Sequence, residues 1–129
     1  YREISPFGDA AGADAPRFRT AMRGVARAVS HPEPGLTLLD GGKRDFPYDE
    51  GLPIPRGVAA DLGDGWTPLD ASVSAMADQH TFLRADVAVG SVVALGLSHP
   101  CTSFDKWRVL PVVDSWESGI VVDLIRTYF

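Results

Sequence analysis

A histidine and a cysteine stand two residues apart in the segment His99-Pro100-Cys101, which follows a run of apolar residues. Imidazole nitrogen and thiolate sulfur are ligands that zinc prefers in proteins. In an extended chain the side chains at positions i and i+2 point to the same face, so this spacing directs both ligands toward one point. Pro100 favours that geometry because it keeps the preceding residue out of the helical region. The pair therefore predicts part of a divalent-metal site, with zinc as the expected metal.

The same pair also has a structural interpretation. A free cysteine is usually a small buried hydrophobe, and a histidine at the end of a strand can simply bond to the backbone. Two protein ligands do not fill the tetrahedral shell of zinc, so other residues, water or substrate would have to complete a site. The choice between the interpretations depends on the surrounding sequence.

The elements that must position these residues are predicted to be β-strands. From Arg19 onward, short β-compatible runs alternate with proline and glycine, a pattern typical of β-sandwiches and barrels. We expect an all-β, or mainly β, fold with long ordered loops and with helix confined to short turns. The expected strands are 21–30, 35–40, 57–62, 69–77, 80–84, 91–98, 107–113 and 119–128.

Two segments are expected to lie outside these strands, and one proline is expected to distort the strand that contains it. Residues 5–16 show no helical or strand period, and residues 1–18 are expected to be a lead-in from an interdomain region, which leaves 19–129 as the domain. The stretch 40–56 is rich in proline and glycine and should be an ordered loop pinned by its aromatic residues. Pro111 removes a hydrogen-bond donor, so its strand should lie at an edge or carry a bulge.

Composition excludes several classes of function. The chain has 129 residues and a formal net charge of -5, with its basic residues scattered, so nucleic acid is not an expected partner. One cysteine excludes an internal disulfide framework and fits a reducing compartment. No apolar run is long enough to span a bilayer and the chain does not begin with a signal-peptide pattern, so we expect a cytoplasmic protein without a membrane partner.

Several longer motifs accompany the His-x-Cys pair. The pair lies within Ser98-His99-Pro100-Cys101-Thr102-Ser103-Phe104-Asp105-Lys106-Trp107-Arg108, which continues into Val109-Leu110-Pro111-Val112-Val113-Asp114. Upstream are Pro32-Glu33-Pro34-Gly35, Gly42-Lys43-Arg44-Asp45 and Tyr48-Asp49-Glu50-Gly51-Leu52-Pro53. Together these motifs resemble the C-terminal part of the metal-activated, pyridoxal-phosphate-dependent D-serine dehydratase and D-threonine aldolase family, from about residue 18 onward.

The resemblance implies a fold and a division of labour. Members of that family have an N-terminal α/β barrel with the cofactor lysine, followed by a β-domain like that of alanine racemase. This chain is similar only to the second domain. Its two lysines, Lys43 and Lys106, lie in motifs that do not resemble the cofactor-lysine segment, so we expect no covalently bound pyridoxal phosphate in this chain. Alone, it is expected to be inactive.

The resemblance also implies a chemistry. It assigns His99 and Cys101 to a divalent-metal site that completes the active site of a lyase acting on β-hydroxy D-amino acids. Aldolase-type members tend to carry His-x-Asp, so Cys101 favours dehydratase or deaminase chemistry. The implied partners are the N-terminal barrel of the same polypeptide, a D-amino acid substrate and a second subunit in a homodimer.

Two further residues are candidate active-site groups. His80, in Asp78-Gln79-His80-Thr81, resembles a family Glu-Glu-His-Gly segment at the histidine only, so an ordinary polar strand residue is the alternative. Tyr1 resembles the end of another family segment. A different class of function also stays open, namely a stand-alone β-barrel that serves as a binding or interaction module. An upstream barrel with a cofactor lysine would favour the enzyme domain over that module.

Overall fold

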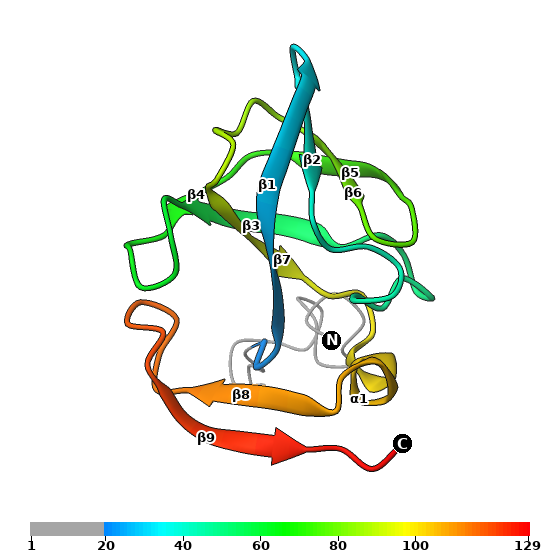
Figure 1. Cartoon of the computed structure of the whole chain (residues 1–129), viewed down its shortest axis with the longest axis vertical. Helices are drawn as coiled ribbons and strands as arrows, with labels where there is room; N and C mark the ends of the chain where they lie inside the picture. The colour runs from blue at the N-terminus through cyan, green and yellow to red at the C-terminus, as the bar shows by residue number, and fades with distance from the viewer. Residues whose placement is uncertain (1–19) are drawn as a thin grey trace, which may run out of the picture.

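The computed structural model describes residues 20–129 as a mainly β-structure (Figure 1). Among these residues, one helical segment interrupts the strands, formed by the 3-10 turn η2 (Pro100–Thr102) and the one-turn helix α1 (Ser103–Lys106). The strands are β1 (Arg23–Glu33), β2 (Leu36–Leu39), β3 (Ile54–Ala59), β4 (Thr67–Pro68), β5 (Ser72–Met76), β6 (Thr81–Arg84), β7 (Val92–Gly96), β8 (Val109–Val113) and β9 (Val121–Arg126).

Seven strands form one antiparallel sheet in the order β4-β3-β7-β1-β2-β6-β5. The sheet curls strongly, so that β5 at one edge returns beside β3 near the other edge (Figure 1). Register shifts in the β1–β2, β3–β7 and β5–β6 pairs lie along this curl, and bulges of this kind bend strands and increase their twist. The expected barrel-like all-β architecture is confirmed as a curled half-barrel.

The core lies on the concave face of this sheet. Residues of β1 from Arg23 to Ala28 alternate between partly exposed and buried, as does β2, which is the pattern of a sheet with one face on the core. The central strand β7 is buried along its whole length between β1 and β3. The buried core cluster consists of Ala26, Ala28, Leu39, Phe46, Met76, Leu83, Val87, Val93 and Leu95.

Strands β8 and β9 form a separate two-stranded hairpin below the curled sheet (Figure 1). Its turn is attached to the loop before β4, where the Trp66 Nε1 donates to the Trp116 carbonyl at 2.8 Å. The two indole rings pack edge to face with centroids 6.5 Å apart, and the Arg23 guanidinium lies 4.6 Å from the Trp116 ring centroid. Aromatic and cation–π contacts therefore tie the hairpin to the large sheet.

Most expected strands are present within a few residues of their predicted bounds. In the part of the chain that the structure describes, helix is confined to a short turn, as expected, although its position at residues 100–106 was not predicted. Pro111 lies in a two-stranded sheet next to a register shift, which confirms the edge or bulge prediction. The two-residue strand β4 was not expected as a separate strand. No helix within residues 20–129 is long and apolar enough to cross a membrane.

Candidate functional site

The His99–Cys101 segment lies where the chain leaves the central strand β7. That strand ends at Gly96, three residues before His99. His99 itself is extended, with φ −142° and ψ 112°, as expected from the following proline. Pro100 then begins the 3-10 turn, so Cys101 is helical. The expectation that the pair occupies one extended strand is therefore wrong, because proline is well suited to the first position of a helical turn.

Asp49, in the connection between β2 and β3, orients the His99 ring. His99 Nδ1 lies 2.9 Å from Asp49 Oδ2. A carboxylate can only accept hydrogen bonds, so Nδ1 carries the hydrogen and donates. In the neutral ring this fixes the tautomer whose basic nitrogen is Nε2. His99 is thus held in the form that coordinates a metal through Nε2.

The same carboxylate contacts the far end of the His99–Thr102 segment. The Thr102 hydroxyl donates to Asp49 Oδ1 at 3.4 Å. The hydrogen bond from His99 is the main cause that lowers the pKa of Asp49 below its ordinary value, and the Thr102 bond acts in the same direction. Asp49 is therefore ionised at neutral pH and keeps its role as an acceptor.

The loop that carries Asp49 is fixed by close backbone packing. Lys43 N and Arg44 N each donate at 3.0 Å to carbonyls of the β5–β6 turn, and Thr81 Oγ1 donates to the Gly41 carbonyl at 2.7 Å. Phe46 is buried in the core. The Gly42-Lys43-Arg44-Asp45 motif is thus a structural clamp on the turn that contains Asp78.

Tyr48 links this loop to the segment after Cys101. The ammonium groups of Lys43 and Lys106 lie 5.6 Å and 5.9 Å from its ring centroid. Trp107 Nε1 donates to the Asp45 carbonyl at 2.7 Å. The expectation of an ordered loop is confirmed, although Tyr48 is exposed and is pinned by cations rather than by the core.

The other candidate active-site residues lie elsewhere or outside the described residues. His80 is exposed in the β5–β6 turn, where its carbonyl accepts from Ala77 N at 2.8 Å. Tyr1 lies outside residues 20–129. Sequence reasoning did not identify Asp49 as a functional residue, although it lies in the family-like motif Tyr48–Pro53. Its contact with His99 spans 50 positions of the sequence, so no local pattern indicates it.

The donor chemistry around His99 and Cys101 fits a divalent metal. The ring is oriented by a carboxylate, as metal-ligating histidines usually are, and Cys101 is exposed on the adjoining turn. Within the described part of the chain, no group of three or more His, Cys, Asp or Glu side chains is arranged to hold a metal ion. A metal on this pair would therefore need further ligands from elsewhere, as the sequence predicts.

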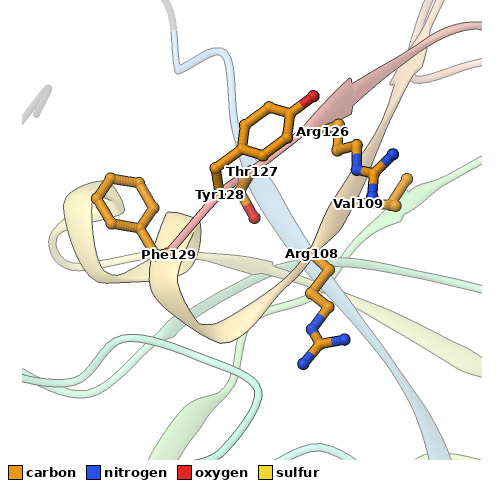
Figure 2. A pocket seen from close by; sticks show the side chains of 6 residues that line it. All are labelled: Arg108, Val109, Arg126, Thr127, Tyr128 and Phe129. Atoms are coloured by element: carbon orange, nitrogen blue, oxygen red, sulfur yellow. The ribbon is translucent and has the colours of Figure 1, made fainter.

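A pocket lies at the open end of the β8–β9 hairpin (Figure 2). It is lined by Arg108, Val109, Arg126, Thr127, Tyr128 and Phe129. Arg126 is the last residue of β9, and Arg108 directly precedes β8. The candidate residues His80, His99 and Cys101 do not line this pocket.

Comparison with known proteins identifies a family that matches this chain and a solved structure with a similar fold. The profile of the family described as "Putative serine dehydratase domain" matches residues 21–113. No curated protein matches the chain. Among solved structures, the D-threonine aldolase from Filomicrobium marinum has a similar fold, with a TM-score of 0.64 and 23% sequence identity. The match covers 79% of this chain but only 26% of the aldolase chain.

Proposed function

Because the chain belongs to the serine dehydratase domain family, we propose that it is the C-terminal, metal-binding domain of a pyridoxal-phosphate-dependent lyase that acts on β-hydroxy D-amino acids. The barrel that binds the cofactor belongs to the rest of the polypeptide. The chain spans about a quarter of the aldolase chain that it resembles in fold, which supports a division into domains. Alone, the domain is inactive.

One observation carries the metal assignment. The Asp49 carboxylate holds the His99 ring in the Nδ1–H tautomer, next to the turn that bears Cys101. Zinc-ligating histidines commonly donate their other ring hydrogen to a carboxylate in this way, and this supports His99 as a ligand. His99 and Cys101 hold the metal in this proposal, and zinc is the metal that their donor atoms favour.

The bound metal would supply Lewis acidity to the β-hydroxyl of the substrate, while the cofactor in the barrel domain would supply an electron sink. The residues of this chain contribute binding and orientation. Aldolase-type members of the family tend to carry aspartate at the position of Cys101, and this cysteine therefore favours the dehydratase or deaminase reaction over the aldolase reaction. We place the proposed enzyme in the cytoplasm, in keeping with its single cysteine. The homodimer is proposed from the family resemblance.

The test uses the intact polypeptide that contains this chain. Its upstream region should encode an α/β barrel with a cofactor lysine, and the purified protein should eliminate ammonia from D-serine or D-threonine. Removal of divalent metal with a chelator should abolish turnover, and zinc should restore it. A start codon near Tyr1 with no barrel upstream would instead support a stand-alone binding module.

Activity in the intact polypeptide also locates the metal ligands. His99→Ala and Cys101→Ala should each lose metal-dependent turnover, because each removes one of two protein ligands. His31→Ala serves as a control, since it replaces an exposed histidine whose ring also lies against a carboxylate, that of Asp86, at 2.7 Å. Wild-type turnover in both ligand variants would contradict the metal assignment.

A further inference from the structure

We propose that Asp49 is the residue that positions both metal ligands, by holding the two ends of the segment that contains them. This inference rests on the proposed function, because it concerns the ligands His99 and Cys101. It assigns a role to a residue in the β2–β3 loop, about 50 positions away in the sequence from the pair that it serves.

The geometry of the carboxylate carries the proposal. Oδ2 accepts from the His99 ring at 2.9 Å, and Oδ1 accepts from the Thr102 hydroxyl at 3.4 Å. These two donors flank Cys101. A single side chain therefore fixes the ring orientation of one ligand and the path of the turn that carries the other.

The loop supplies a rigid base for this carboxylate. Gly42 packs so tightly on the β5–β6 turn that an added Cβ would lie 2.5 Å from the Ala77 carbonyl oxygen and from His80 N. Tyr48, directly before Asp49, has the Lys106 ammonium of α1 over its ring. The loop thus contacts the ligand segment on both sides of Cys101.

Rigid support of this kind changes metal affinity rather than fold. Carboxylates that orient a ligating histidine typically contribute about 10- to 100-fold in metal affinity. Asp49 is partly exposed, with 44% of its side chain accessible, so its replacement leaves no buried cavity. The metal-free stability of an Asp49 variant should therefore stay close to that of the wild type.

The experiment measures zinc affinity by competition with a chromophoric chelator, in the intact polypeptide. Asp49→Ala should weaken zinc binding roughly 10- to 100-fold. Asp49→Asn should lose less, because its amide oxygen can still accept the Nδ1 hydrogen. Thr102→Val should lose least, because it frees only one end of the segment. Glu50→Gln is the matched control, since it removes an adjacent exposed carboxylate and should bind zinc like the wild type.

The outcomes separate this inference from the proposed function. If zinc binding depends on His99 but Asp49→Ala binds as tightly as the wild type, the positioning role is wrong and the metal site stands. If His99→Ala also leaves zinc binding unchanged, the metal site itself is wrong. Thermal unfolding of the metal-free proteins is measured in parallel. A loss of affinity in Asp49→Asn that is matched by an equal loss in Glu50→Gln would overturn the inference as a general effect of charge.

Discussion

Gly42 has no room for a side chain, because backbone atoms of the β5–β6 turn surround it. A Cβ there would meet backbone atoms of residues 77, 78 and 80 at 2.5 to 2.6 Å. Backbone atoms cannot rotate away, so the loop or the turn would have to move. We expect Gly42→Ala to lower the free energy of unfolding by about 1–3 kcal/mol.

Gly65 is the matched control for that substitution, because nothing lies within 4 Å of its added Cβ. Gly65→Ala should change the free energy of unfolding by less than about 1 kcal/mol. Urea unfolding of both variants checks the pair. Equal stability of Gly42→Ala and Gly65→Ala would mean that the loop is not clamped on the turn.

The hydrogen bonds of the Asp86 carboxylate should make the stability of the fold depend on pH near the β1–β2 hairpin. The Gly35 amide donates to its Oδ1 at 2.6 Å, and the His31 ring lies 2.7 Å from the same atom. The Gly35 bond and then the His31 bond lower the pKa of Asp86 below its ordinary value of 3.8. A lowered carboxyl pKa stabilises the fold above 3.8, and this contribution is lost as the pH falls through the folded-state value.

Asp86→Asn should therefore be less stable than the wild type at about pH 5, and the difference should shrink as the pH falls below the ordinary carboxyl value. Urea midpoints across this range give the measurement, with Asp70→Asn as an exposed control. A stability difference that stays constant down to the acid limit would show that ionised Asp86 is not the stabilising form.

At the residue scale, the sequence predicts His99 and Cys101 as metal ligands, and this stays a prediction, but it does not predict the contact of Asp49 with His99. The His-x-Cys spacing and its flanking motifs are local signals. The contact from Asp49 to His99 joins two loops that meet only after β3 and β7 have paired. No periodicity reports such a contact, so Asp49 could be found only from the fold.

The strands differ sharply in what they bury, and stability should follow burial. Leu95 in β7 is 0% exposed, whereas Leu124 in β9 is 60% exposed. Leu95→Ala should cost about 2–5 kcal/mol, because it leaves a cavity in the core. Leu124→Ala should cost less than about 0.5 kcal/mol. Comparable losses in the two variants, measured by chemical denaturation, would mean that β9 is packed against other residues.

At the element scale, alternation and breaker residues made the strands predictable. β1 to β3 and β5 to β9 each begin within a few residues of the expected position, because proline and glycine punctuate the chain between them. The helical turn at 100–106 was missed, because proline at position 100 is compatible with an extended chain and with the start of a helix. Because Cys101 lies in this turn, the two-residue period of a strand does not place its side chain on the same face as that of His99.

At the scale of the whole molecule, the curled sheet accounts for where the site lies. The curl brings the β2–β3 loop to the end of β7, and there Asp49 contacts His99 and Thr102, which flank the second proposed ligand, Cys101. A barrel-like, curled sheet was predictable from the number and spacing of strands. The separate β8–β9 hairpin was not, because local sequence does not say which strands pair.

The central claim is that His99 and Cys101 together hold a divalent metal. Cobalt(II) titration of the intact polypeptide tests it most directly, because a cobalt–thiolate bond gives a charge-transfer absorption that a histidine ligand does not. We predict that the wild type shows this absorption, that Cys101→Ala binds cobalt without it, and that His99→Ala binds cobalt more weakly. Cobalt binding with the same affinity and the same thiolate-free spectrum in all three proteins would contradict the claim.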